Sequence, residues 1–166
     1  MLKPLEQFYC DTCEEIIDAP DQGMVEWLQS TTEPAHSFEI VHHVPHSPRV
    51  DSGVSRSQNP RPQGCYQHQN KPLKKDLKIE RYIGRIGLVQ LLQFIDVGPH
   101  HVPNYSGVNF DDGREFAELF RRLQLPYYEE ARRYWDQAKR DGFFDGANEN
   151  RIYQSDFLEG IVSKYG

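Results

Sequence analysis

The three cysteines of this chain form a split pattern that constrains its fold more than any other feature. Cys10 and Cys13 are separated by two residues, and Cys65 is followed at the same interval by His68. Zinc in proteins prefers four thiolate or imidazole ligands, and a C-x2-C or C-x2-H interval lets one turn present two of them. The pattern therefore predicts one tetrahedral Zn²⁺ site that brings distant parts of the chain together, with the ligands Cys10, Cys13, Cys65 and His68.

Two other histidines are alternatives for the fourth position. Residues 38–44 alternate in a way that predicts a strand with Phe38, Ile40 and His42 on one face. His42 is thus expected on an apolar face, and His43 follows it directly. A strand that leaves a hairpin at this point can pass the ion. We rank His68 first on its spacing and keep His42 and His43 as alternatives.

The number of protein ligands separates a structural site from a catalytic one. Four protein ligands close the coordination sphere, whereas a catalytic zinc keeps one position for water. We therefore expect a structural zinc. An open site with three cysteines would be the enzymatic version, with Glu14 or Glu15 as the nearest proton carrier. A third interpretation is that the cysteines are ordinary reduced thiols in a small core.

The first 70 or so residues resemble a zinc ribbon, in which two knuckles at the ends of β-hairpins share one metal. The residues that carry the resemblance are Cys10, Cys13, Cys65 and His68. Zinc ribbons serve as nucleic-acid binders, protein-docking modules and structural staples. The resemblance therefore implies a metal and a hairpin without selecting a function.

Periodicity and turn residues predict the remaining elements. Residues 24–29 and 38–44 are expected to pair as an antiparallel hairpin. Residues 45–64 contain almost no large apolar side chain, so we expect a mobile loop between the two halves of the metal site. Helices are predicted over 86–95, 115–123 and 126–140, followed by a last helix that Ser155 caps. In the first helix, Leu88, Leu91, Leu92 and Ile95 follow the spacing of one apolar face.

These elements predict an α+β fold. A zinc-clamped hairpin would pack on a C-terminal bundle of three to four helices. The expected domains are a zinc-ribbon-like module over residues 1–70 and a mainly helical domain over residues 71–166.

Charge is unevenly distributed along the chain. The formal net charge is −6 overall, but residues 47–85 carry +6 between acidic ends of −8 and −4. This basic middle and a helix-turn-helix-like pair over 115–140 suggest nucleic-acid binding. The cations that would contact phosphates are Lys74, Lys75, Arg81, Arg132 and Arg133. Acidic residues on the same helix as the last two would repel the backbone, so we rank this function second.

Two further groups contain residue types that can ligate a metal. Asp96, His100 and His101 suit a hydrolytic ion by residue type, but adjacent histidines in a turn point in different directions. The histidines of residues 36–46 lack a fixed ligand spacing. We interpret the first group as solvated or capping residues and the second as polar strand and loop residues.

The sequence lacks an apolar run of the roughly 20 residues that cross a bilayer and lacks a secretory signal, so we expect a cytoplasmic protein with no membrane partner. The expected function is a non-enzymatic, zinc-stabilised protein-binding or regulatory module. Alternatives are a nucleic-acid-binding regulator and a small metal-dependent hydrolase. The oligomeric state stays open. An aromatic helix face is the expected contact for a protein partner, and its residues are Tyr127, Tyr128, Tyr134 and Trp135.

Overall fold

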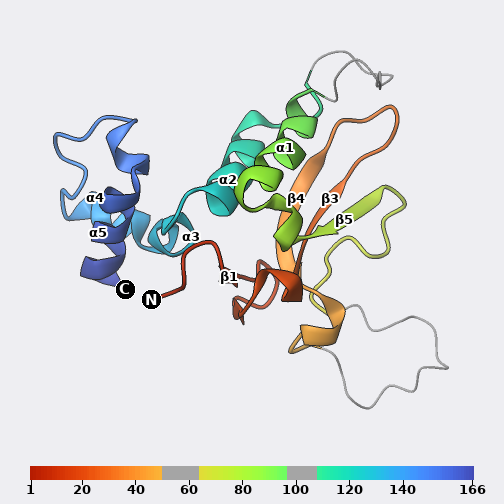
Figure 1. Ribbon diagram of the computed structural model, residues 1–166, viewed down its shortest axis with the longest axis horizontal. Coiled ribbons are helices and arrows are strands. Elements are labelled where there is room, and N and C mark those ends of the chain that lie inside the picture. The colour runs from red at the N-terminus through yellow and green to blue at the C-terminus, as the bar shows by residue number, and fades with distance from the viewer. Residues whose placement is uncertain (50–63, 97–107) are drawn as a thin grey trace.

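The computed structural model describes residues 1–49, 64–96 and 108–166, and it confirms the predicted α+β class. Strands precede residue 80 and the long helices follow it. Figure 1 shows two lobes, which we call the N-terminal lobe (described residues up to 124) and the C-terminal lobe (125–166). Most of the predicted mobile loop, residues 50–63, lies outside the described residues, as do His100 and His101.

The larger sheet of the N-terminal lobe is antiparallel, with the strand order β4-β3-β5. The predicted hairpin is confirmed: β3 (Gly23–Leu28) pairs with β4 (His36–His42), with Val25 opposite Ile40. The third strand, β5 (Lys74–Lys78), pairs with the other edge of β3 and was not predicted. Its sequence, KKDLK, has one apolar residue and no alternation that would mark a strand.

A second, two-stranded sheet carries the first cysteine pair. β1 (Phe8–Tyr9) and β2 (Ile16–Ile17) are antiparallel, and Phe8 lies opposite Ile17. Both side chains are fully buried, so they anchor the hairpin to the core of the lobe. The turn between the strands contains Cys10 and Cys13, so one turn presents both cysteines, as the C-x2-C interval predicts.

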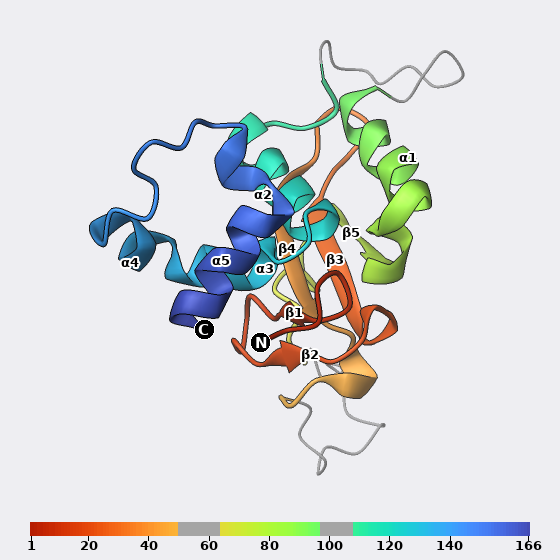
Figure 2. The same ribbon diagram turned by 60° about the vertical axis from the view of Figure 1, so that its left-hand side comes forward.

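Two helices pack beside the larger sheet (Figure 2). α2 (Gly113–Gln124) contacts β4 and buries Phe116, Leu119 and Leu123, which recur at helical intervals, while Phe120 is half-buried against the same cluster. The Asp112 side chain caps α2 by accepting a hydrogen bond from the Arg114 backbone N–H at 2.7 Å. α1 (Gly84–Ile95) contacts α2.

The predicted apolar face of α1 is mostly wrong. Of its four leucine and isoleucine residues, only Leu91 is buried, together with Gly87 and Phe94. The reason is a close backbone approach at Gly87, where an added Cβ would overlap the Tyr82 carbonyl group. Because glycine lets the two backbone segments touch, the side of the helix that contains it faces inward. Hydrophobic periodicity does not detect such a contact.

The C-terminal lobe consists of short helices around aromatic side chains. It contains α3 (Tyr128–Ala131), α4 (Trp135–Arg140) and α5 (Ser155–Tyr165). The predicted helix 126–140 is interrupted by a 3₁₀ turn over Arg132–Tyr134. Ser155 is the first residue of α5 rather than its cap, and no side chain caps this helix.

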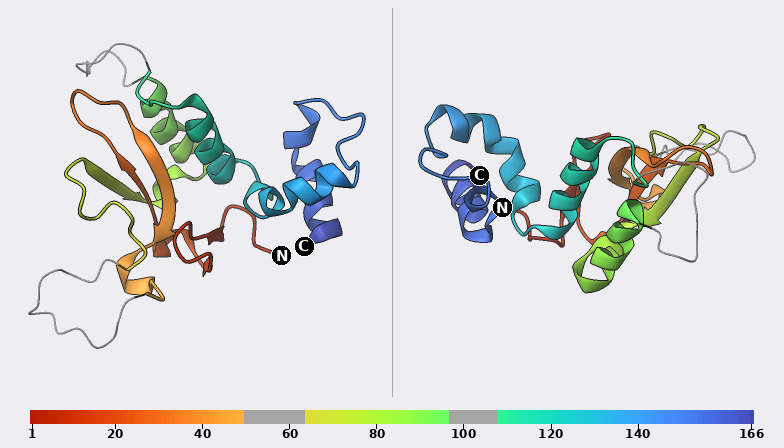
Figure 3. Two further views of the ribbon diagram at one scale, coloured as in Figure 1. Left: turned by 180° about the vertical axis from the view of Figure 1, so that it is seen from behind. Right: turned by 90° about the horizontal axis from the view of Figure 1, so that it is seen from above.

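Buried apolar side chains of the described residues form two clusters that follow the lobes. The strands, α1 and α2 share the first cluster, and α3, α4 and α5 form the second. The cores therefore divide near residue 124 and not near residue 70. Two views in Figure 3 show the C-terminal lobe standing to one side of the sheet. The expected division into a zinc-ribbon-like module over residues 1–70 and a helical domain over residues 71–166 stays a prediction.

Candidate metal centre

Four side chains of the N-terminal lobe converge on one point. Each of Cys10, Cys13, His42 and Cys65 offers one ligand atom, and these atoms all lie within 4.8 Å of one another. His42 Nδ1 lies 3.4 Å from Cys13 Sγ and 3.8 Å from Cys65 Sγ. A tetrahedral zinc with bonds of about 2.3 Å to sulfur and about 2.05 Å to nitrogen requires a sulfur–nitrogen separation of about 3.6 Å. The arrangement therefore fits one metal ion.

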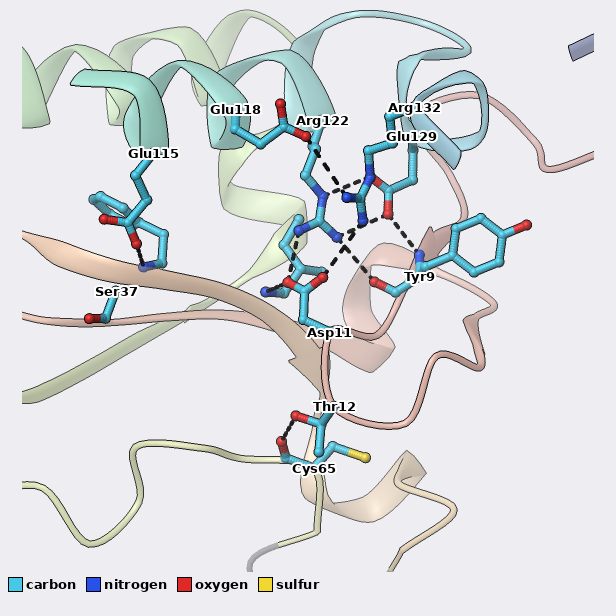
Figure 4. A network of polar contacts seen from close by, with 12 residues as sticks. Tyr9, Asp11, Thr12, Ser37, Cys65, Glu115, Glu118, Arg122, Glu129 and Arg132 are labelled. Carbon is cyan, nitrogen blue, oxygen red and sulfur yellow. Dashed lines mark hydrogen bonds and ion pairs between the residues drawn. The ribbon is translucent and has the colours of Figure 1, made fainter. Parts of the chain in front are cut away.

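Three separate segments supply these ligands. Cys10 and Cys13 lie in the β1–β2 turn, where the Glu14 N–H donates to the Cys10 carbonyl at 2.9 Å. His42 is the last residue of β4, and Cys65 follows the undescribed residues 50–63. The first and third segments also touch directly, because Thr12 Oγ1 donates to the Cys65 carbonyl at 2.6 Å (Figure 4).

His42 occupies the fourth position, which corrects our ranking of His68. His68 is buried elsewhere, with Nε2 2.7 Å from the Ser37 carbonyl and its backbone N–H directed at Glu26. His43, the other alternative, is not among the converging side chains. Equal spacing after Cys65 did not predict the ligand, because the sheet delivers His42 from another strand. The placement of His42 on an apolar strand face was the signal that could have identified it.

The second ring nitrogen of His42 is held by the backbone. Nε2 lies 3.2 Å from the Ile16 carbonyl oxygen, which can only accept a hydrogen bond. This contact assigns the proton to Nε2 and leaves the Nδ1 lone pair facing the sulfurs. Metal-ligating histidines typically have their other nitrogen fixed in this way.

Burial controls the protonation of the thiols. Burial raises the pKa of the Cys13 thiol to about 12 and also raises the pKa of Cys65. Ser47 Oγ, 3.0 Å from Cys65 Sγ, opposes the latter shift. A buried thiol becomes a thiolate when a cation binds it, so metal binding here releases protons.

A buried arginine links the β1–β2 turn of the N-terminal lobe to the C-terminal lobe (Figure 4). Arg122 of α2 donates from Nε and Nη2 to the Glu129 carboxylate at 2.7 and 2.9 Å. Its Nη1 donates to Asp11 at 2.8 Å, between the two ligand cysteines in sequence. Burial alone lowers the pKa of Arg122, but Glu129 and Asp11 outweigh it and raise the pKa above its ordinary value. No sequence pattern had indicated Arg122.

The aromatic residues expected to contact a partner belong to the C-terminal core. Tyr128 is 5% exposed, and the other three are half-buried against the same cluster. Tyr127 also donates its hydroxyl to Glu159 at 3.0 Å. The structure therefore gives these side chains a packing role.

The cations expected to contact nucleic acid are mostly engaged within the chain. Lys74 pairs with Asp76 at 2.7 Å and lies over the Tyr66 ring. Arg132 lies near Glu129, Glu118 and Asp11, and Arg133 lies over the Tyr9 ring. The remaining two, Lys75 and Arg81, are exposed.

The fold and the ligand set define a chain with a four-residue site able to hold a metal ion. Comparisons with protein-family models, curated proteins and solved structures found no match to this chain. Within residues 1–49, 64–96 and 108–166, no helix has both the length and the apolar character to span a bilayer.

Proposed function

We propose that this chain is a non-enzymatic, zinc-stabilised protein-binding module. The observation that carries the proposal is the convergence of Cys10, Cys13, His42 and Cys65 from three segments. A donor set of three thiolates and one imidazole suits zinc, whereas hard cations such as magnesium and calcium prefer oxygen. An ion held there would cross-link the β1–β2 turn, the end of β4 and the segment before β5.

The closed ligand set favours a structural role over a catalytic one. Four side chains fill a tetrahedral sphere, and an activated water would need one of these positions. Cys10, His42 and Cys65 are at most 5% exposed, so substrate would have little access to the ion. A hydrolase is therefore less well supported than a structural staple.

The exposed surface of α1 supports protein binding. Five large apolar side chains on this helix are exposed, and we call them the α1 face: Ile86, Leu88, Val89, Leu92 and Ile95. They are 41–73% exposed. Scattered apolar residues on a surface are normal, but a contiguous group on one helix is typical of an interaction site. This face is better placed for a partner than the half-buried aromatic side chains of the C-terminal lobe.

Metal analysis of the purified protein tests the proposal. We expect one equivalent of zinc in the parent, retention in His68→Gln, and loss in both Cys65→Ser and His42→Gln. The matched histidine variants separate ligation from a general loss of packing, because both side chains are buried. A metal-free but folded parent, or a zinc content that depends on His68 and not on His42, would contradict the site.

Nucleic-acid binding remains the alternative that the charge distribution suggests. It requires affinity that falls steeply with salt and is lost when Lys74, Lys75 and Arg81 are changed together. Because Lys74 already has two partners in the chain, the structure offers less support for this function than for protein binding.

A further inference from the structure

We infer that the α1 face binds a second copy of this chain, so that the protein forms a two-fold symmetric dimer with antiparallel α1 helices. This inference deepens the proposed protein-binding function and rests on it. It names a second copy of the chain as the partner of the α1 face.

The centre of the face can pack on itself. At 100° per residue, Gly87, Leu91 and Phe94 point to the core, and Val89 and Leu92 lie near the middle of the opposite side. In an antiparallel pair about an axis between residues 90 and 91, Val89 of one copy approaches the partner's Leu92, and the partner's Val89 approaches Leu92. An interface between identical surfaces requires this reciprocity.

The charges on α1 favour an antiparallel pair of copies. Residues 86–95 contain no charged side chain, so two copies meet without burying or opposing charges on these helices. Arg85 lies at the N-terminal end, and a parallel pair would place the two arginines side by side. Antiparallel helices separate them and oppose the two helix dipoles.

A membrane surface fits the face less well. Helices that lie on membranes carry lysine or arginine along their polar side, whereas the polar side chains of residues 86–95 are Gln90 and Gln93. The net charge of −6 also disfavours an anionic bilayer. α1 is about 18 Å long. A specific interface needs about 1,000 Å² in total, so the helix pair would form its centre and neighbouring surface would complete it.

Sedimentation equilibrium of the zinc-loaded full chain tests the inference. We expect a monomer–dimer equilibrium in the micromolar range. Val89→Glu or Leu92→Lys should each weaken the dimer about 100-fold or more, since each places charge at the centre of the interface. Gln90→Glu adds a charge on the same helix away from this centre and is the control that retains the dimer.

Mixing the two variants identifies the geometry. Val89→Glu and Leu92→Lys are each expected to be monomeric on their own. An equimolar mixture should form a heterodimer, because the carboxylate introduced at position 89 of one copy meets the ammonium group introduced at position 92 of the other. Failure of the mixture to associate would overturn the antiparallel arrangement. A parent that is monomeric at 200 µM, roughly the upper range of weak specific association, would overturn the dimer.

Two further measurements separate this inference from the proposed function. Zinc content is determined on every sample, so a zinc-loaded monomer overturns the dimer alone, while loss of the zinc site overturns the function on which it rests. Sedimentation of the parent with phosphatidylglycerol vesicles tests the other occupant. Vesicle binding that Val89→Glu abolishes would assign the face to a membrane and overturn the dimer.

Discussion

The two lobes are stabilised by different means. The N-terminal lobe combines a three-stranded sheet, two helices and four converging side chains that could hold a metal ion, and many of its core side chains have no exposed area. The C-terminal lobe has about 40 residues and few fully buried side chains. Most of the side chains packed around its core are half-buried aromatic rings, including Trp135, Phe144 and Tyr153.

This difference reflects size. A unit of about 40 residues buries too small a share of its surface to fold readily alone and usually needs a cross-link, a metal or a larger neighbour. The C-terminal lobe uses its neighbour: Glu129 binds Arg122 and accepts from the Tyr9 N–H at 2.9 Å, and buried Glu130 binds the Leu2 N–H at 2.5 Å. We therefore expect the C-terminal lobe to depend on the N-terminal lobe more than the reverse.

Metal removal should produce the largest effect. Structural zinc contributes apparent binding energies of about 10–16 kcal/mol in small domains, comparable to the whole stability of a protein. Chelation or Cys65→Ser should unfold both lobes together. The two tryptophans report this separately: Trp27 in the Trp135→Phe background reports the N-terminal lobe, and Trp135 in the Trp27→Phe background reports the C-terminal lobe. Persistence of native Trp135 fluorescence after chelation would show that the C-terminal lobe is independent.

Loss of the buried ion pair should affect the C-terminal lobe first. Glu129→Gln removes one partner of a buried pair, which typically costs about 3 kcal/mol, while Arg122 keeps Asp11. In urea, Trp135 should then report unfolding at a lower midpoint than Trp27. The control is Arg151→Gln, which breaks an exposed ion pair with Asp156 in the same lobe and should leave the midpoint nearly unchanged. Equal shifts for both tryptophans would mean that the lobes unfold as one.

A pair of glycine substitutions compares the close backbone contact in the N-terminal lobe with the aromatic packing in the C-terminal lobe. In Gly87→Ala, the added Cβ meets the Tyr82 backbone, and we expect a loss of about 2–3 kcal/mol. In Gly160→Ala, the added Cβ would lie 3.3 Å from Phe143 Cζ, at the edge of a ring. A small ring shift would accommodate it, and the higher helix propensity of alanine contributes up to about 1 kcal/mol. The midpoint temperature of thermal unfolding should be higher for Gly160→Ala than for the parent and lower for Gly87→Ala. The reverse order would contradict this difference in packing between the two lobes.

The smallest predicted effect is a pH dependence of the N-terminal lobe. Burial and the neighbouring Asp11 carboxyl raise the pKa of Glu39 from 4.5 to about 7. Between these values the folded chain holds a proton that the unfolded chain has released, so this contribution to stability falls as pH rises from about 4.5 to about 7. The free energy of unfolding of Glu39→Gln should thus exceed that of the parent by on the order of 1 kcal/mol at pH 8, after allowance for solvent screening.

Comparison of parent and Glu39→Gln at several pH values checks this sign. The difference in unfolding free energy should be small near pH 5 and reach its plateau above pH 7, and Trp27 should report it. A difference that is constant across this range would rule out titration of Glu39 as its cause.

Local features of the fold were predictable from the sequence. The C-x2-C interval gave the turn between β1 and β2, and the alternation around Ile40 gave the β3–β4 hairpin. The predicted helix over 115–123 agrees with α2, and the spacing of Phe116, Leu119 and Leu123 fits its buried side. These features depend on residues close together in the chain, whose geometry the backbone fixes with little help from tertiary packing.

Features that depend on distant contacts were missed. β5 has no strand pattern, because its place is set by hydrogen bonds to β3. In the sequence, Arg122 does not differ from other helix arginines. Only the tertiary structure brings Glu129 and Asp11 beside it. Such contacts depend on the register and packing of elements that are far apart in the sequence.

The sequence by itself determined that three sulfurs would be available to one ion and that a hairpin would lie near them. Only the tertiary structure decided that His42, and not His68, completes the set, and that α1 turns Val89 and Leu92 outward. Spacing along the chain fixes which side chains one turn or helix presents together. It does not fix which strand ends beside the cysteines, as β4 does with His42, or which side of α1 a close backbone contact at Gly87 turns inward.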